Sequence, residues 1–130
     1  MMRSTRTAIA LIAVVACTAG SASATIQSGW PLLAFDRSSG CELEIAGNGR
    51  FIEIRASGLI PGEALQFTLR NGDMKPIAWQ VYAAPSGAWR HVYIPFRFNR
   101  DGGTVAVHIA ASRCSLMASV PWSRQFRTIE

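Results

Sequence analysis

The sequence is poor in lysine, histidine and acidic residues. Lys75 is its single lysine, and 13 basic residues stand against 8 acidic ones, for a formal net charge of +5. The arginines are spread along the chain without a basic run. Nucleic-acid-binding proteins usually gather such charge into one patch, so we expect a mildly cationic surface and no nucleic-acid partner.

Signatures of catalysis are also missing. The chain has no glycine-rich phosphate loop, no nucleophilic-serine motif and no Cys-x-x-Cys pair. Its 2 histidines, His91 and His108, have no second metal ligand at short spacing, and we expect both to point outward from the fold. We therefore predict that the protein is not an enzyme and holds no metal or cofactor.

Three acidic residues surround a predicted hairpin turn: Glu42 and Glu44 precede it, and Glu53 follows it. Residues of like phase on paired strands are neighbours, so these carboxylates could meet as an acid/base pair. Arg50 and Arg55 would reach the same face, however, and a solvated, salt-bridged surface is the better interpretation. We assign no catalytic residue.

No apolar run is long enough to form a permanent membrane span, which takes about 20 residues. The longest run covers residues 8–16, follows a basic start and precedes a small, polar stretch. These are the three parts of a secretory signal. We predict that residues 1–24 are a cleavable signal peptide, cut between Ala24 and Thr25, and that the mature chain works in the periplasm or outside the cell.

A second processing site overlaps this leader. The segment Val14-Val15-Ala16-Cys17 resembles the lipobox of bacterial lipoproteins, although valine stands where leucine is usual. In those proteins the cysteine is lipidated and becomes the first residue. Lipidation of Cys17 would hold the domain on a membrane surface, and it is the only membrane association that the sequence predicts.

Cys41 and Cys114 remain after the leader is removed. An even pair of cysteines in an exported domain predicts a disulfide. In the chain-entropy model this bond would stabilise the fold by about 4 kcal/mol. Both cysteines share the phase of the inward apolar residues of their strands, and two free buried thiols are the alternative.

From residue 41 onward, apolar residues recur with period two between turn residues, which is typical of half-buried strands. We predict an all-β domain over 41–122, preceded by an extended segment, 25–40, which is an arm or a further strand, and followed by a flexible tail, 123–130. The predicted strands, seven in all, fall within 41–45, 52–56, 65–69, 77–81, 89–98, 104–109 and 116–120. Short strands with one apolar face suit a two-layer antiparallel sandwich, and a small barrel is the main rival.

The phases of two neighbouring strands favour the sandwich. Apolar side chains take even numbers in 89–98 and odd numbers in 104–109. A simple hairpin centred on Asp101 would set an apolar face against a polar one, and the conflict disappears if the chain changes sheets at 99–103. Pro95 cannot donate to a ladder, so its strand should lie at an edge or carry a bulge.

Three segments resemble parts of bacterial immunoglobulin-like domains. Residues 56–63 (ASGLIPGE) resemble the connection from the second strand to the third, 81–89 (VYAAPSGAW) the start of a later strand, and 101–107 (DGGTVAV) the entry to the sixth. The resemblance spans 41–122 and implies an immunoglobulin-like antiparallel β-sandwich that serves adhesion, scaffolding or ligand presentation. The cysteines depart from the antibody pattern, because they lie on the first and last predicted strands rather than the second and sixth.

Several aromatic residues lie out of phase with the apolar sets or at strand ends. Trp89, Trp122 and Tyr93 are the candidates for ligand contact, because exposed rings near arginines stack on sugars or anchor proteins; covering the ends of the fold is the alternative. The sequence thus predicts an exported, non-catalytic β-sandwich with a binding or structural role, its partner a glycan or an envelope protein. A lipid-anchored envelope protein and a carbohydrate-binding module are the alternatives.

Overall fold

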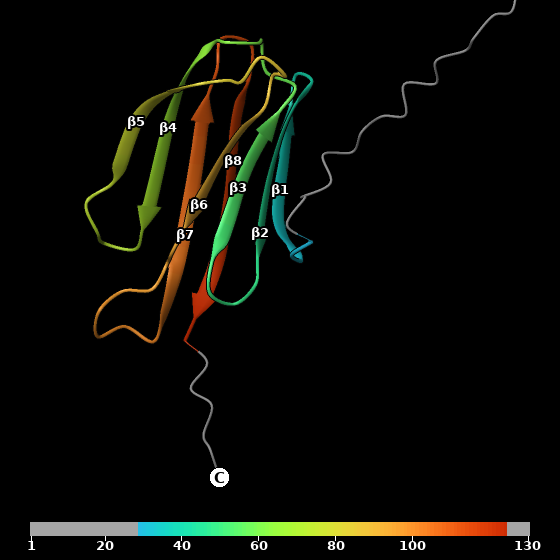
Figure 1. Ribbon diagram of the computed structural model, residues 1–130. Helices are drawn as coiled ribbons and strands as arrows, with labels where there is room; N and C mark the ends of the chain where they lie inside the picture. Colours follow the sequence, from blue (N-terminus) through green and yellow to red (C-terminus); the bar gives the residue numbers. More distant parts are fainter. Residues whose placement is uncertain (1–28, 125–130) are drawn as a thin grey trace, which may run out of the picture.

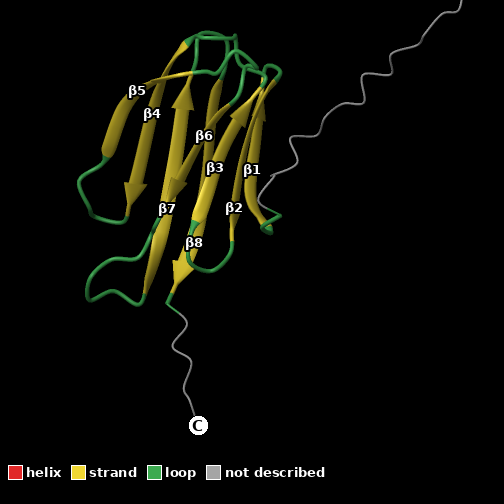
Figure 2. Ribbon diagram, in the orientation of Figure 1, coloured by secondary structure: helices red, strands yellow, loops and turns green. Residues whose placement is uncertain are grey.

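The computed structural model describes residues 29–124, which form eight strands and no helix (Figures 1 and 2). An all-β fold is therefore confirmed for this part of the chain. The strands are β1 (Leu32–Ser38), β2 (Cys41–Gly47), β3 (Ile52–Ser57), β4 (Ala64–Asn71), β5 (Ile77–Tyr82), β6 (Trp89–Tyr93), β7 (Gly102–Ala110) and β8 (Ser115–Ser123).

The strands pair into two antiparallel sheets of four strands, in the orders β1-β2-β3-β6 and β5-β4-β7-β8. The sheets form two layers (Figure 1) and bury a common hydrophobic core. Three connections pass from one sheet to the other, at 58–63, 83–88 and 94–101. This is a β-sandwich-like arrangement, in which each sheet hides its apolar face against the other.

Alternation places the predicted apolar sets in this core. Leu43 of β2, Ile54 of β3, Leu65 of β4, Val107 of β7 and Leu116 of β8 have no exposed surface. Their neighbours in β4 and β8 are mostly exposed. Burying a side chain of this size stabilises the fold by about 1.5–3 kcal/mol, so the period-two pattern is the main reason that these segments form strands here.

Part of segment 25–40 forms a further strand, β1. It pairs with β2 through a turn at Ser39 and Gly40, whose φ values of 49° and 85° suit a tight hairpin. On its other side β1 lies beside β8, where Asp36 Oδ2 accepts a hydrogen bond from the backbone N–H of Met117 at 2.8 Å. This bond occupies part of the edge of β8, where another chain would otherwise pair.

The prediction for 89–98 is wrong in length and in phase. β6 ends at Tyr93, because Pro95 has no N–H to continue the ladder and its carbonyl instead accepts a 2.7 Å hydrogen bond from Asn71 Nδ2. His91 pairs with Ile54, which faces the core. The odd-numbered residues of β6 therefore point inward, and the expectation that His91 points outward is wrong as well.

The predicted change of sheet after β6 does occur, but for another reason than the phases. Both β6 and β7 turn odd-numbered residues inward, so the phases do not conflict. The change occurs because residues 94–101 leave the edge of one sheet and β7 then inserts between β4 and β8 in the other. As Pro95 suggested, β6 is an edge strand.

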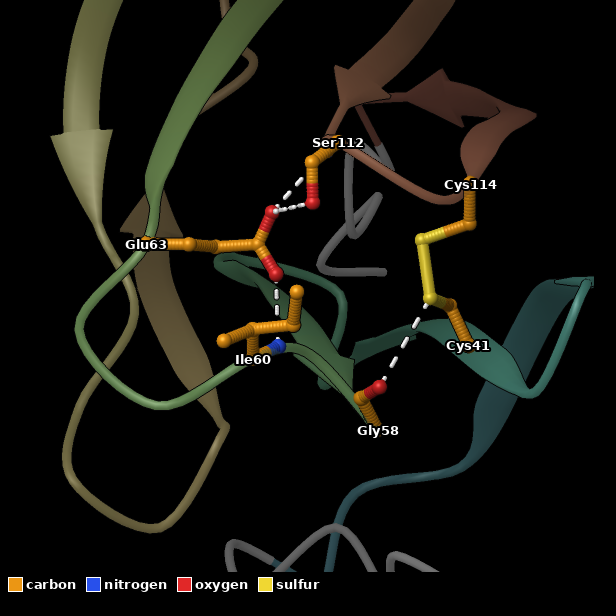
Figure 3. Close-up of a disulfide and its surroundings, with 6 residues drawn as sticks. All are labelled: Cys41, Gly58, Ile60, Glu63, Ser112 and Cys114. Atoms are coloured by element: carbon orange, nitrogen blue, oxygen red, sulfur yellow. Dashed lines mark hydrogen bonds between the residues drawn. A yellow bond between two sulfur atoms is a disulfide. The ribbon is translucent and has the colours of Figure 1, made fainter.

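The disulfide between Cys41 and Cys114 is confirmed (Figure 3). The two Cα atoms lie 6.3 Å apart, and both residues are buried. The bond joins the start of β2 in one sheet to the residue before β8 in the other. Cys41 Sγ also lies 3.7 Å from the carbonyl oxygen of Gly58, a van der Waals contact because this sulfur carries no hydrogen.

Glu63 fastens the same end of the fold (Figure 3). Its Oε1 accepts hydrogen bonds from the backbone N–H of Ser112 at 2.9 Å and from the Ser112 hydroxyl at 3.0 Å. Its Oε2 accepts one from the N–H of Ile60. These bonds join the β3–β4 loop to the β7–β8 loop, and the one from the Ser112 N–H contributes most to holding the pKa of Glu63 below its ordinary 4.5.

Acid should weaken these hydrogen bonds of Glu63. A carboxyl whose pKa is lower in the folded state stabilises the protein fully above its unfolded pKa of 4.5 and loses that contribution as the pH falls through the folded value. Glu63→Gln should therefore lower the stability at pH 7 and flatten its decline in acid, since an amide cannot accept all three bonds. Urea unfolding at neutral and acidic pH checks this, and an unchanged pH dependence in the variant would contradict it.

The predicted leader, with its cleavage between Ala24 and Thr25 and the alternative lipidation of Cys17, lies outside the described residues, as do 25–28 and 125–130. Residue 123, placed in the predicted tail, is the last residue of β8. Within residues 29–124 there is no helix with the length and apolarity that a membrane crossing requires.

Candidate functional site

The open side of the molecule lies between β5 and β6. Each of these strands has one neighbour in its sheet, β4 and β3 respectively, so both are edge strands. On the opposite side, β1 lies against β8. Rings from β5 and β6 approach each other across the gap between the sheets: the Trp79 and His91 centroids are 5.3 Å apart, with the ring planes at 90°.

Four rings, Phe67, Trp79, Trp89 and His91, form what we call the aromatic cluster. Phe67 of β4 is buried at its base, with its centroid 4.8 Å from Trp89 and 5.9 Å from Trp79. His91 stacks on Trp89, with centroids 6.0 Å apart and planes 14° from parallel. Trp79 is 45% exposed, so the cluster reaches the solvent. Such ring pairs are favourable beyond their burial and hold Trp89 in place.

Acid should loosen the aromatic cluster before it unfolds the protein. Burial lowers the pKa of His91 below its ordinary 6.5, so the folded state favours the neutral ring. Such a base stabilises the fold above its unfolded pKa and loses that contribution as the pH falls through the folded value. Below pH 6.5 we therefore expect tryptophan fluorescence to change and stability to fall.

His91→Gln is the variant that checks this, because it removes the titrating group from the cluster. His108→Gln is the control, since His108 lies on the outer face of the other sheet, bonded to the Ser115 hydroxyl at 2.9 Å. The fluorescence change below pH 6.5 should vanish in the first variant and persist in the second. The reverse outcome would refute the assignment to His91.

Beside the cluster, a pocket of about 250 Å³ opens where β5 ends and β6 begins; we call it the edge pocket. Tyr82, 62% exposed, forms one wall. The turn between the strands is fixed, because Gly87 has a φ of 75° and lies too near the carbonyl of Leu59 for any Cβ. The residues that line the pocket are Arg55, Tyr82, Ala84, Ala88, Trp89 and Arg90.

Arg90 is held at this pocket by a buried carboxylate. Its Nε donates a hydrogen bond to Glu53 Oε1 at 2.8 Å. Glu53 is 0% exposed, and its Oε2 is buried without a hydrogen-bond partner in the described structure. A buried carboxylate with one unsatisfied oxygen costs stability. What this arrangement provides is a fixed position for a guanidinium whose side chain is still 57% exposed.

The remaining acids of the first hairpin lie on the same outer face. Arg37 Nε is 3.0 Å from Glu42 Oε1. Burial raises the pKa of Glu44, and the neighbouring Glu42 raises it further, while Arg55 and Arg37 oppose this. The face thus carries ion pairs rather than two carboxyls sharing a proton.

Of the three rings singled out from the sequence, only Trp89 lies at the edge pocket. Trp122 is 8% exposed, contrary to the exposure expected of it, and its Nε1 donates to Asn71 Oδ1 at 2.9 Å. Asn71 Nδ2 in turn donates to the Tyr93 hydroxyl at 3.1 Å and to the Pro95 carbonyl. Tyr93 and Trp122 therefore take part in a network that joins the two sheets at the other end of β6.

Asn71→Ala should destabilise the protein by about 2–3 kcal/mol, because a buried polar group left without a partner costs about 1–3 kcal/mol. The variant leaves both the Trp122 N–H and the Pro95 carbonyl without their hydrogen-bond partner. Gln66→Ala, on the exposed face of the same strand, should change stability by less than about 0.5 kcal/mol. Urea unfolding measures both, and equal effects would contradict the role given to Asn71.

Sequence reasoning missed Trp79, His91 and the two arginines as site residues. The alternation predicts Trp79 as a core residue, and its side chain does point inward, but on an edge strand an inward ring reaches the solvent. Arg55 and Arg90 carry no signal, since they lie on different strands of the outer face. Tyr82 does carry a signal in the sequence, because its ring is out of phase with the apolar set of its strand.

Two other candidate sites, a metal site and a second pocket, have weaker support. His91 and His108 lie in different sheets, and no group of three His, Cys, Asp or Glu side chains among residues 29–124 is arranged to hold a metal ion. A smaller pocket, of about 180 Å³, opens at the other end of the sandwich, where Phe51, Phe96 and Trp122 contribute to its wall. It has no charged pair like that of Arg90.

Comparison with known proteins gave no match to any family model, curated protein or solved structure. Function must therefore be inferred from the residues of this chain and their geometry.

Proposed function

We propose that the chain is exported and that its β domain is a non-catalytic binding module, which contacts its ligand through the aromatic cluster and the edge pocket. Arg90 carries this proposal: a buried, half-satisfied carboxylate holds its guanidinium at a pocket open to solvent. Residues that are held in an arrangement that costs stability are commonly functional. The exposed rings of Tyr82 and Trp79 add the apolar contact area that such sites use.

The strand order supports an immunoglobulin-like topology. With β2, β3 and β6 taken as strands A, B and E, and β5, β4, β7 and β8 as C′, C, F and G, the sheets read A-B-E and C′-C-F-G. β1 is then an addition beside A. The disulfide joins A to the residue before G instead of B to F. Domains of this class present ligand-binding surfaces on a rigid framework, although the fold alone does not specify a function.

Export is supported by the leader and by the disulfide. Structural disulfides form and persist mainly in oxidising compartments, and the bond between Cys41 and Cys114 is buried between the sheets. The periplasm or the extracellular space is the location that fits both. In the alternative, Cys17 is lipidated and becomes the first residue of the mature chain.

The intact mass of the protein, isolated from outside the cytoplasm, tests this proposal. We expect a chain that starts at Thr25 and is two hydrogens lighter than its reduced form. An unprocessed, reduced chain in the cytosol would overturn export. Cys17→Ser decides the alternative, because a lipid-anchored protein would move from the membrane fraction to the soluble one, and an unchanged distribution would exclude lipidation.

Carbohydrate recognition is the binding function that the edge pocket favours, because the exposed ring of Tyr82 offers a face on which a sugar can stack. A glycan array probed with the secreted protein and with Tyr82→Ala tests it. Tyr82 is largely exposed, so its loss should leave the core intact and abolish the signal. Equal signals from both proteins, or no glycan bound at all, would remove this function.

A further inference from the structure

We infer that β5 pairs antiparallel with β5 of a second copy of this chain, so that the sheet β5-β4-β7-β8 continues into that of the second copy across a two-fold axis at Gln80. β5 forms the outer edge of its sheet (Figure 1). Within residues 29–124, no strand pairs with the side of β5 that faces away from β4. This self-association goes beyond the proposed ligand binding, because it uses the backbone edge of β5 rather than the edge pocket.

The other exposed strand edges carry features that prevent pairing. Natural sheets block their edges with charged residues, prolines or covering segments. β1 contains Asp36 and Arg37, and Asp36 also bonds the edge of β8. β6 contains Arg90 and is followed by Pro95. The sequence of β5 is IAWQVY, which has neither a charged residue nor a proline, so its edge is open to a further strand.

The backbone hydrogen bonds beside β5 show which of its groups point outward. The N–H of Ala83, the residue after β5, donates to the carbonyl of Glu63 on the β4 side at 2.9 Å. Backbone groups alternate in direction along a strand, and the register between β4 and β5 is unbroken. The odd-numbered residues of β5 therefore bond β4, and the N–H and C=O groups of Ala78, Gln80 and Tyr82 point outward.

This outward row is limited at both ends. Before β5 stands Pro76, which has no N–H to donate. After β5, the N–H of Ala84 donates to the Ala88 carbonyl at 2.7 Å, and the Ala84 carbonyl accepts from the N–H of Gly87 at 2.8 Å. The row available for pairing therefore has Gln80 at its centre, with one residue of the row on either side.

A row that is symmetric about its centre matches a second copy of itself. In an antiparallel pair centred on Gln80, Gln80 lies opposite Gln80 of the second copy, and Ala78 lies opposite Tyr82 of the second copy. Residues that lie opposite each other in this way exchange two hydrogen bonds. Every outward N–H and C=O group of the row therefore gains a partner.

Neighbouring registers satisfy the row less well. A shift of the centre by one residue toward the N-terminus would place Tyr82 opposite Pro76, which has no N–H. The opposite shift would place Ala78 opposite Ala84, whose N–H and C=O groups are already bonded within the chain. A buried backbone group without a partner costs stability, so the register centred on Gln80 is favoured.

The side chains around this axis also suit a second copy. On the inner face, Trp79 would lie beside Val81 of the second copy, and aromatic and β-branched residues are favourable cross-strand neighbours. Trp79 is 45% exposed in the single chain, so pairing would bury part of its ring. On the outer face, the small Ala78 leaves room for the ring of Tyr82. Two identical uncharged edges meet without repulsion, as a two-fold interface requires.

Pairing of one strand creates a small interface. Stable interfaces bury about 1,200–2,000 Å², which a single added strand does not reach, so we expect a weak dimer that forms as the concentration rises. The aromatic cluster would then lie beside the two-fold axis. Ligand contact would fall to the edge pocket, whose lining residues other than Tyr82 lie outside β5.

Sedimentation velocity of the secreted, oxidised protein over a range of concentrations tests this pairing. We expect the mass to rise from that of one chain toward that of two. Amide hydrogen exchange, followed by NMR over the same range, identifies the strand. Exchange at Ala78, Gln80 and Tyr82 should slow as the dimer forms, whereas exchange in β6, the other open edge strand, should not change.

Gln80→Pro removes the N–H at the centre of the pair. This N–H points away from β4, so the variant removes no ladder bond within the chain, and proline is tolerated at such positions on edge strands. We expect the variant to keep the circular dichroism spectrum of the wild type and to remain a single chain at every concentration. Self-association of the folded variant would overturn the inference.

Charged replacements at Gln80 test the axis without a change of backbone. Like charges directly opposite each other destabilise a strand pair, so Gln80→Lys and Gln80→Glu should each weaken self-association by about fivefold. An equal mixture of the two variants should associate more tightly than either alone. Gln66→Lys is the matched control, because Gln66 pairs with Gln80 on the exposed face of β4 within the same chain, and it should leave self-association unchanged.

Four further outcomes would overturn the inference. The first is the mass of a single chain at every concentration, and the second is a mixture of the charged variants that associates no more tightly than each variant alone. The third is slowed exchange in β6 instead of β5. The fourth is slow exchange of the β5 amides in a single chain, which would assign this edge to another segment of the same chain. Each of these results would leave export and ligand binding standing.

Discussion

Replacing Cys41 and Cys114 together by alanine should lower the free energy of unfolding by about 4 kcal/mol. The bond closes a loop of 73 residues, and in the chain-entropy model a loop of this length restricts the unfolded chain by about that amount. Natural domains have a total stability of about 5–15 kcal/mol. The loss is therefore large enough to leave part of the protein unfolded at 37 °C.

Urea unfolding of the oxidised wild type and of the double variant measures this effect. The reduced wild type is the control, and it should match the double variant, because both lack the cross-link and keep the same core. Glu63 continues to join the two loops at this end and should slow local fraying. A loss of less than about 1 kcal/mol would contradict the entropic role given to the bond.

Phe67→Ala should cost about 3–5 kcal/mol, the range for removing a phenylalanine ring from a packed core. Phe67 is buried, and its ring contacts Trp79, Trp89 and His91. Removing it takes away the base of the aromatic cluster as well as core volume. We therefore expect tryptophan fluorescence to shift and binding at the edge pocket to weaken, because Trp89 loses its support.

Two controls separate the effects of Phe67→Ala. Phe67→Leu keeps most of the volume and should cost less stability, yet it still removes the ring contacts and should change the fluorescence. Phe98→Ala replaces a ring that is 90% exposed and should change stability by less than about 0.5 kcal/mol. Comparable losses from Phe67→Ala and Phe98→Ala would contradict the packing described for the cluster.

The strands could largely be predicted because alternation is a local property. Leu43, Leu65, Val107 and Leu116 reveal their inward direction within segments of a few residues, and the structure buries each of them. The disulfide could be predicted from number and phase, since two cysteines lie outside the predicted leader and both share the phase of core residues. These predictions needed no knowledge of which strands lie side by side.

The wrong predictions concern residues whose direction or burial is set by contacts with another segment of the chain. In the predicted strand 89–98, Val92 and Ile94 look like the inward set, but pairing of β6 with β3 fixes the opposite phase through Ile54 and His91. The strand ends early because Asn71, from the other sheet, takes the carbonyl of Pro95. The sequence pattern predicts an exposed Trp122. Its ring is buried because the same Asn71 accepts its N–H.

The sequence by itself determined that the residues from Cys41 onward form short strands with one apolar face, bridged by one disulfide, because period-two burial and cysteine pairing follow from residue type and spacing. Only the tertiary structure decided which residues surround the edge pocket, the proposed binding site. Arg55, Tyr82 and Arg90 lie on three strands in two sheets, and Glu53 fixes one of them from beneath. The sequence pattern does not show which edge strands meet across the core, and that meeting creates the edge pocket.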